Sequence, residues 1–479
     1  MMMFRSATIL LAMSSSALAF NIGGKRQSPL STPTVASPKK AVAVPMDTPN
    51  FGVPNLSKTK LDPKDDWVRN LDYDGFAKEV SALGKELRKN TGKDDVDHLN
   101  KIVNWRNMAA VFGLATIWLP VNPLTVAALS TWTYASWTMI AHHTCHGGYN
   151  RVDAGRFNSR GFALGALNRV VDWLDWMQPE AWNIEHNRLH HYRLNESKDP
   201  DLVQRNLDFI RDGKYPQFLK YVVVAFFLPI WKWFYYAPNT YKELKTNEWI
   251  RSGKELPEGY DPELAVTVVS MLDPGRKATR KIVNPLDFYK NVVGPMFFAR
   301  YVAIPGALAL IPGVGPTLAV RALTSLVLAE LLTNVHAFVT IVTNHAGEDM
   351  YTFDDAVRPN SGSFYVRQII GSVNYDTGDD VTDFWHGWLN YQIEHHVWPD
   401  LSMLQYQRGA PKLKAICEKY GVPYVQENVF ERTRKTIDVM VGRTSMRRFP
   451  TQFEPADHKI ADSSLTWKST NGAIEDESA

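Results

Sequence analysis

Cysteine is almost absent from this sequence, which has Cys145 and Cys417 and no others among its 479 residues. Two cysteines so far apart do not build the disulfide framework of a small secreted domain. They also do not supply a structural zinc site of the usual kind, in which several of the four ligands are thiolates. The sequence therefore excludes both the disulfide-stapled proteins and the cysteine-rich zinc modules.

A strong excess of charge of one sign is also lacking. The 53 Lys and Arg residues against 50 Asp and Glu residues leave a formal net charge of +3. Nucleic-acid-binding proteins usually carry a concentrated basic surface, and no block of basic residues alternates here with aromatic residues. We therefore expect no nucleic acid among the partners.

Aromatic and apolar residues, in contrast, are plentiful: 12% of the residues are aromatic, and 15 are Trp. Trp is enriched where a protein meets the membrane interface. Four apolar stretches approach the ~20 residues that a membrane span needs, and they form two pairs, each interrupted by a short Pro-containing breaker. The sequence thus predicts an all-α membrane protein with two transmembrane hairpins, or about four spans. The pairs are 107–118 with 124–140, and 292–310 with 317–343.

The charges around these stretches predict their orientation. The breakers Leu119–Pro123 and Ile311–Pro316 contain no Lys or Arg, whereas the regions beyond the other ends of the hairpins are rich in both. Positive residues mark the cytosol-like or stromal side. A further apolar stretch, Leu219–Phe234, includes Lys220 and Lys232, so we expect it at the interface, with a span as the alternative.

Histidine is the most informative residue type, because ten of the thirteen histidines lie in or near three short clusters. Imidazole is a common neutral metal ligand, and a four-residue spacing places both ends of an H-x-x-x-H box on one helix face. Adjacent histidines diverge by ~100° on a helix, so such a pair can serve two neighbouring ions. Nitrogen-rich, thiolate-poor coordination suits iron that activates oxygen. The ten are His142, His143, His146, His186, His190, His191, His345, His386, His395 and His396.

Two patterns inside the apolar stretches concern a substrate. Thr131, Ala135 and Thr138 share a helical stripe with His142, which indicates either close helix packing or the wall of a substrate channel. Glu330 and Asn334 are costly in lipid, so we expect both side chains in the bundle interior. There they either pair with a polar neighbour or line a substrate cavity.

The N-terminal region has the composition of a targeting sequence. Residues 1–19 have a basic residue, an apolar run and an A-x-A-like cleavage site, as in a signal peptide. Residues 20–46 lack Asp and Glu and are rich in Ser, Thr and Pro, as in a transit peptide. The combination resembles the bipartite plastid presequence of diatoms and related algae, which predicts a plastid membrane. Ordinary secretion with a disordered linker, or location in the endoplasmic reticulum membrane, is the alternative.

The rest of the chain divides by composition. Residues 47–101 form a polar arm with one amphipathic helix, whose apolar face is Phe76, Val80, Leu83 and Leu87. Residues 102–446 form the membrane domain, with a helical cap over the histidine-rich site. Residues 447–479 are polar and end in acidic residues, and we expect them to be a disordered tail.

The three histidine boxes together resemble those of the membrane-bound fatty acid desaturases. The order is H-x-x-x-H, then H-x-x-x-H-H, then Q-x-x-H-H, and the likeness covers about residues 104–426. Gln392 at the start of the third box is typical of the front-end branch. The resemblance implies a diiron centre that uses O2 to place a cis double bond in the acyl chain of a membrane lipid. The implied iron ligands are His142, His146, His186, His190, His191, His345, His395 and His396.

The resemblance also indicates weaker candidates, either as ligands or as partners that orient a ligand imidazole. They are His143, His386, Gln392, Glu185 and Glu394. The two glutamates are equally compatible with exposed helix charges that have no role.

The chain departs from the front-end branch in its electron supply. Those enzymes usually carry a fused haem domain with a His-Pro-Gly-Gly motif, which this sequence lacks. We therefore expect a separate electron donor, a ferredoxin in a plastid, with a cytochrome b type protein as the alternative. A galactolipid, a phospholipid and a thioester are all compatible acyl carriers.

Two other functions compete with desaturation. A diiron hydroxylase or oxygenase acting on an acyl lipid, sterol or carotenoid uses similar boxes. A non-catalytic protein that binds or transports metal would carry ligands along a path through the spans, whereas the histidines here gather at one end of them.

Overall fold

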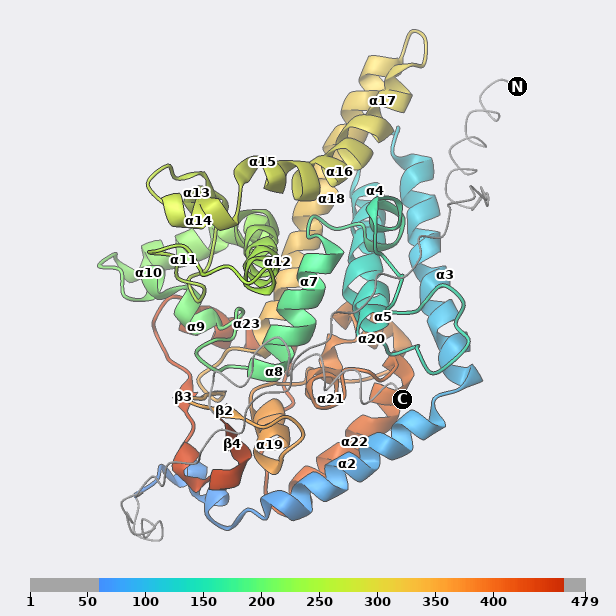
Figure 1. Cartoon of the computed structure of the whole chain (residues 1–479). Coiled ribbons are helices and arrows are strands. Elements are labelled where there is room, and N and C mark those ends of the chain that lie inside the picture. Colours follow the sequence, from blue (N-terminus) through green and yellow to red (C-terminus); the bar gives the residue numbers. More distant parts are fainter. Residues whose placement is uncertain (1–59, 461–479) are drawn as a thin grey trace, which may run out of the picture. The chain divides into compact units, whose positions relative to one another are not determined.

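The computed structural model describes residues 60–460, which are mostly helical and include two short two-stranded sheets (Figure 1). Contacts divide the chain after Asp62, so the fold described here is that of the unit beginning at Pro63. The predicted all-α class is confirmed. The expected signal peptide and transit-like segment lie outside the described residues.

The amphipathic helix expected in the N-terminal arm is α2 (Tyr73–Asn90), which follows a 3-10 turn, Pro63–Asn70. Asp72 caps it by accepting a hydrogen bond from the Gly75 backbone N–H at 2.9 Å. The helix packs on α19 (Gly362–Ile370) and α22 (Met403–Tyr420), so it is part of the folded domain. Its buried apolar face includes Phe76, Val80, Leu83 and Leu87.

The first apolar pair forms α3 (Lys93–Thr116) and α4 (Pro123–Tyr134). Asn122 starts α4 by accepting a hydrogen bond from the Thr125 backbone N–H at 3.0 Å. The helix continues through a π-helical segment, Ala135–Ala141, into α5 (His142–Cys145). A buried apolar cluster joins these helices to α18; its members are Ile117, Leu129, Ala322, Leu326 and Ala329.

Two helical runs among the described residues are long and apolar enough to cross a membrane, Pro285–Ala309 and Gly315–Asn344. They coincide with the second predicted hairpin. The first run contains α15 (Pro285–Phe288), α16 (Gly294–Phe297) and α17 (Ile304–Ala309), and the second is α18 (Gly315–Ile341) with a final 3-10 turn. Because α3 and α4 are not among these runs, the count of four spans stays a prediction.

The apolar stretch Leu219–Phe234, which was expected at the interface, is bent, and the side chain at the bend is buried. Two helical runs meet here at 77°, one containing α11 (Gln217–Phe227) and the other α12 (Ala237–Arg251). By length and composition the two runs together form either one broken span or a re-entrant loop. Lys232, at the bend, is fully buried and forms ion pairs with Asp175 and with Glu330. Charges inside the protein therefore anchor the bend, and the interfacial position, with a span as the alternative, stays a prediction.

The segments between and after the spans place the histidines. Figure 1 shows α5, α8 and α21 gathered around the end of α18 that lies opposite the α17–α18 turn. The remaining helices are α6 (Ala166–Asn168), α7 (Pro179–Ile184), α8 (His191–Arg193), α9 (Val203–Asn206), α10 (Asp208–Arg211), α13 (Val268–Leu272), α14 (Lys277–Ile282), α20 (Asp380–His386), α21 (Gln392–Val397) and α23 (Val429–Met440).

Four short strands attach the C-terminal segment to the rest of the folded domain. Strand β1 (Tyr351–Thr352) pairs in parallel with β3 (Arg447–Arg448), and β2 (Ala356–Val357) pairs antiparallel with β4 (Lys459–Ile460). This differs from the disordered tail expected from residue 447 onward, because residues 447–460 pair with the folded domain. The rest of that tail lies outside the described residues.

Candidate metal centre

Four parts of the chain bring their histidines together. Helix α5, the segment from α7 to α8, the end of α18 and α21 each contribute, although they are far apart in the sequence. The ligand atoms form two compact groups of histidines, within each of which all atoms lie within 4.8 Å of one another, and a third such group, His186, His190 and Asp201, overlaps both. The first group is His142, His146, His186 and His395, and the second is His190, His345 and His396.

A π-helical segment, Glu185–His190, decides how the second box is shared. The four-residue spacing predicted that His186 and His190 act together on one face. In the structure the two rings do stack, with centroids 5.3 Å apart, and the wider turn also brings the Nε2 atoms of His186 and His191 to 3.3 Å. His190 joins the second group, while the His191 ring stacks on His396 with centroids 4.4 Å apart. His191 therefore lies between the two groups.

Partners outside the cluster fix the orientation of three imidazoles. His190 Nδ1 donates to the Asp199 carboxylate at 2.9 Å, and His396 Nδ1 donates to Gln368 Oε1 at 3.2 Å. His395 Nδ1 donates to the Tyr406 hydroxyl at 3.3 Å. Each of these bonds places the ring proton on Nδ1, so the Nε2 lone pair faces the cluster. The box pattern gave no signal for Asp199, Gln368 or Tyr406, and only the fold shows their role.

The inward-facing nitrogens are arranged for a cation. Nε2 of His142 lies 3.0 Å from that of His395 and 3.2 Å from that of His186. Nε2 of His396 lies 3.3 Å from that of His345. Lone pairs held this close repel one another unless a proton or a metal ion lies between them. The buried Nε2 atom of His146 also lacks a hydrogen-bond partner within the described residues. These donors fit divalent metal ions.

Electrostatics favours a metal over protons in this position. Burial, followed by the nearby imidazoles, lowers the pKa of His395 and His396 well below the ordinary value. Burial and His190 lower the pKa of His345 to about 3. These three imidazoles are therefore neutral at physiological pH, which is the protonation state that binds metal.

Comparison with known proteins identifies the family of the chain. The family model described as fatty acid desaturase matches residues 116–428, which is more than half of the chain and contains all three boxes. The chain belongs to the fatty acid desaturase family. The family recognised from the histidine boxes is thereby confirmed, and so is the prediction that the protein is an enzyme of the desaturase class.

Individual relatives are distant. The chain is 22% identical, over 77% of its length and 79% of the relative's, to an NADPH-dependent stearoyl-CoA 9-desaturase of Mycobacterium tuberculosis. It is 24% identical to Delta(5) fatty acid desaturase A of Dictyostelium discoideum over 51% of this chain and 48% of that one. It is 33% identical to a Delta(8)-fatty-acid desaturase of Euglena gracilis over 21% and 24% of the two chains. No solved structure matches significantly.

Among the weaker ligand candidates of the desaturase, Gln392 contacts a histidine group, whereas His143 and His386 belong to neither group. Gln392 touches the second group, because its side-chain Nε2 donates to His345 Nε2 at 2.8 Å. His143 lies beside the first group but donates its Nδ1 proton to the Met139 carbonyl at 2.7 Å and is in neither group. His386 is in neither group, and its Nδ1 donates to the Thr382 carbonyl at 2.9 Å within α20.

The two glutamates are buried rather than exposed. Glu394 accepts hydrogen bonds from Asn374 at 2.8 Å and from the Tyr424 hydroxyl at 2.7 Å, and burial raises its pKa to about 7. Burial, followed by neighbouring Asp201, raises the pKa of Glu185 well above the ordinary value. Neither glutamate belongs to a group of candidate ligands. Both therefore act around the ligand helices and not among the converging nitrogens.

The intramembrane residues proposed for a substrate channel have separate environments. Glu330 accepts a hydrogen bond from Arg300 at 2.8 Å, and Asn334 donates to the Pro229 carbonyl at 2.8 Å, so both pair with polar neighbours. Thr131 lines an apolar surface groove with Trp385 and three other residues. Ala135 and Thr138 are buried against neighbouring helices.

The sequence patterns did not single out His336, which lies in α18. His336 of α18 stacks on Tyr134 with centroids 3.8 Å apart and donates to the Trp385 carbonyl at 2.7 Å. These contacts join α18 to α4 and α20, away from both histidine groups. Its role is structural, and its isolation in the sequence is the signal that separates it from the boxes.

Proposed function

We propose that the protein introduces a cis double bond into a fatty acyl chain, using O2, two irons and electrons from a separate donor. The observation that carries the proposal is the convergence of histidine nitrogens, all buried except those of His146, into two groups. Iron bound there supplies the activation of O2 and the oxidation of unactivated methylene groups, which side chains alone cannot perform. In the balanced reaction, the acyl chain and O2 take up two electrons and two protons and give the alkene and two waters.

The two groups assign the ligands. His142, His146, His186 and His395 would hold one iron, and His190, His345 and His396 would hold the other. His191 lies between them and Gln392 contacts His345, so both complete the set that this chain offers. Asp199, Gln368 and Tyr406 keep the rings oriented through their Nδ1 atoms.

The relatives support desaturation over hydroxylation, because those reported above are all named as desaturases. We extend this to an acyl substrate in a membrane, since residues 60–460 include two helices suited to span one. Because the sequence carries no His-Pro-Gly-Gly motif, we propose a separate donor, a ferredoxin if the N-terminal segment directs the protein to a plastid.

The test is lipid analysis of cells that express the chain from residue 47 onward together with a ferredoxin and its reductase. We expect a new unsaturated acyl species and about two irons per protein. The double variant His395→Ala and His396→Ala should lose both, while His386→Gln, a histidine change outside the centre, should keep both. An oxygenated product in place of an alkene would contradict desaturation, and retained iron in the double variant would contradict the ligand assignment.

A further inference from the structure

The C-terminal segment, residues 447–460, is tied to helix α19 at two points that lie one helical turn apart. Oγ of Ser363 lies 3.1 Å from Nδ1 of His458. Four residues further along α19, the Arg367 guanidinium bonds the Glu454 carboxylate. Because α19 also packs on α21, it lies between this segment and the helix that carries the third histidine box (Figure 1).

The ion pair between Arg367 and Glu454 is bidentate and buried. Arg367 Nε donates to Glu454 Oε1 at 2.8 Å, and Arg367 Nη2 donates to Oε2 of the same carboxylate. The Arg367 side chain is 2% exposed and the Glu454 side chain is 0% exposed. Two parallel hydrogen bonds fix the orientation of a guanidinium as well as its position. The guanidinium is therefore held in one geometry by the C-terminal segment.

Arg367 also joins α19 to the loop that follows the second histidine box, residues 194–201. Its Nη1 atom lies 3.5 Å from Oε1 of Glu196 in this loop. The neighbouring Asn195 side chain donates to the Gly371 carbonyl, at the end of α19, at 3.1 Å. One guanidinium therefore contacts the C-terminal segment and this loop at the same time.

The two elements joined by this guanidinium carry the outer partners of two ligands in the second histidine group. Gln368, the next residue of α19, accepts the Nδ1 proton of His396. Asp199, in the loop, accepts the Nδ1 proton of His190. The Asp199 backbone N–H also donates to the Glu196 carbonyl at 3.0 Å. A shift of the guanidinium would therefore disturb both outer partners together.

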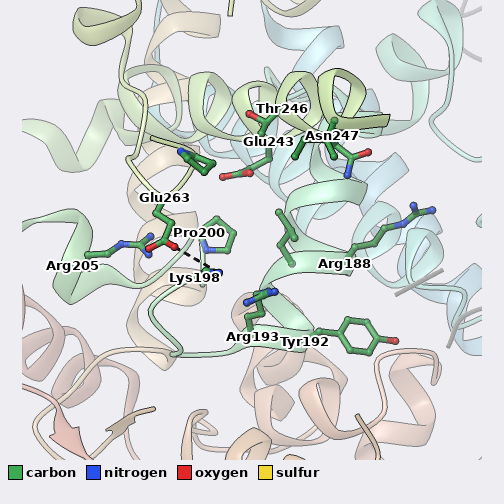
Figure 2. A pocket seen from close by; sticks show the side chains of 13 residues that line it. Arg188, Tyr192, Arg193, Lys198, Pro200, Arg205, Glu243, Thr246, Asn247 and Glu263 are labelled. Carbon is green, nitrogen blue, oxygen red and sulfur yellow. Dashed lines mark ion pairs between the residues drawn. The ribbon is translucent and has the colours of Figure 1, made fainter. Parts of the chain in front are cut away.

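The same loop has further contacts that do not involve α19. Nζ of Lys198 lies 3.9 Å from Oε1 of Glu263, at a cavity of about 320 Å³ that both residues line (Figure 2). Arg205, which also lines this cavity, donates to the Asp199 carbonyl at 2.8 Å. The ion pair at the cavity therefore offers a control that loosens the loop without touching α19.

We propose that Glu454, acting through Arg367, is a positioning residue for the second histidine group. It keeps Gln368 and Asp199 in the places from which they orient the ligand imidazoles. This inference rests on the proposed function, in which the second group holds one of the two irons. It gives residues 447–460 a role in the metal centre, although none of them contributes a ligand.

The effect should be confined to one of the two metal ions. His395, in the first group, is oriented by the Tyr406 hydroxyl of α22. Its outer partner therefore belongs to neither of the elements that Arg367 joins. We expect a change at Glu454 to weaken metal binding by the second group and to leave the first group as it is.

Metal titration of the purified full chain tests the proposal without requiring turnover. Fe(II), added in competition with a coloured chelator, should bind the wild type in two steps, one for each group. Glu454→Gln should weaken one step about tenfold, the lower end of the loss typical of a direct outer partner, and leave the other step unchanged. Arg367 retains Asp355 and Glu196 as partners in this variant, so the fold should persist. Equal losses in both steps, or no loss in either, would overturn the proposal.

A double-variant cycle separates positioning from a purely structural role. Gln368→Ala removes the hydrogen bond to His396, so it should weaken the same metal step as Glu454→Gln. If Glu454 acts through Gln368, the combined variant should lose less affinity than the product of the two separate fold-changes. Fold-changes that multiply in full would refute the positioning role, because residues that act independently are additive in free energy.

Two matched controls loosen the same elements without touching the Arg367 ion pair. Arg447→Gln removes an ion pair of the C-terminal segment with Asp65 at 2.8 Å, and Glu263→Gln removes the ion pair of the loop with Lys198. Both controls should keep both metal steps, while thermal unfolding reports any loss of stability. An equal weakening in Arg447→Gln would assign the effect to general loosening and sink the proposal.

Product analysis separates failure of this proposal from failure of the proposed function. A wild type that desaturates, beside a Glu454→Gln variant that binds Fe(II) equally well, would keep the function and reject the positioning role. The expected metal effect without desaturation by the wild type would do the reverse. Glu454→Asp keeps the charge but is too short for both hydrogen bonds. It tests the same step with less risk to the fold and should weaken that step by less than Glu454→Gln does.

Discussion

Asp199→Asn isolates the contribution of one buried charge to metal binding. The Asp199 carboxylate accepts the His190 Nδ1 proton at 2.9 Å and the Asn195 and Asp201 backbone N–H groups at 2.8 and 2.9 Å. Burial lowers the pKa of His190, yet Asp199 outweighs it and raises that pKa overall, which shows how strongly the carboxylate polarises the ring. Asparagine keeps the shape and one acceptor but removes the negative charge.

The expected loss follows from these contacts. Replacing an outer partner of a metal-bound histidine typically costs 10- to 100-fold in metal affinity, which is about 1.4–2.8 kcal/mol. The amide nitrogen also faces a backbone N–H, so the unfolding free energy should fall by about 1–3 kcal/mol. The assay is Fe(II) titration in competition with a coloured chelator, beside denaturant unfolding of the metal-free protein.

A matched control separates the charge from a general effect. Asp354→Asn removes an exposed carboxylate that bonds Arg448 at 2.5 Å, away from the centre, and should leave both quantities unchanged. If Asp199→Asn binds Fe(II) as tightly as the wild type while folded, the outer carboxylate does not tune His190 and the reasoning is refuted.

Three further outcomes follow from other contacts. His345→Ala should lower the iron content from about two to about one per protein by elemental analysis, because the second group would keep two of its three histidines; an unchanged content would refute the grouping. Lys232→Met should lower the free energy of unfolding by about 3–5 kcal/mol, since it leaves buried Asp175 without its ion-pair partner. Adding Asp175→Asn to this variant should restore part of the lost stability, as measured by thermal unfolding. Burial alone would raise the pKa of Asp400, but Arg88 and Arg151 lower this pKa overall. The Asp400 carboxylate therefore stabilises the fold above the ordinary pKa of 3.8, and this stabilisation disappears as the pH falls below that value. In acid unfolding, Arg88→Met should start from a lower stability and depend less on pH in that window.

The class of the protein and a set of candidate ligands were readable from the sequence. The three-box order does not depend on knowing which segments meet, so the resemblance to the desaturase family already implied eight histidines as candidate ligands. The second hairpin was readable as well, because apolar length and a Pro-Gly breaker are local properties, and α17 and α18 follow it closely. The apolar face of α2 was found for the same reason.

Only the tertiary structure decided how these histidines divide and what surrounds them. The π-helical turn at Glu185–His190 brings Nε2 of His191 to that of His186, while His190 also reaches His345 and His396, and ideal helical spacing does not contain that arrangement. Asp199, Gln368 and Tyr406 act through contacts between segments that are distant in sequence or folded back by a loop, as do Lys232 and Glu330 at the bend of the span. The residue types of the centre are thus a property of the sequence, whereas their partition and their outer partners depend on distances that only the packed chain defines.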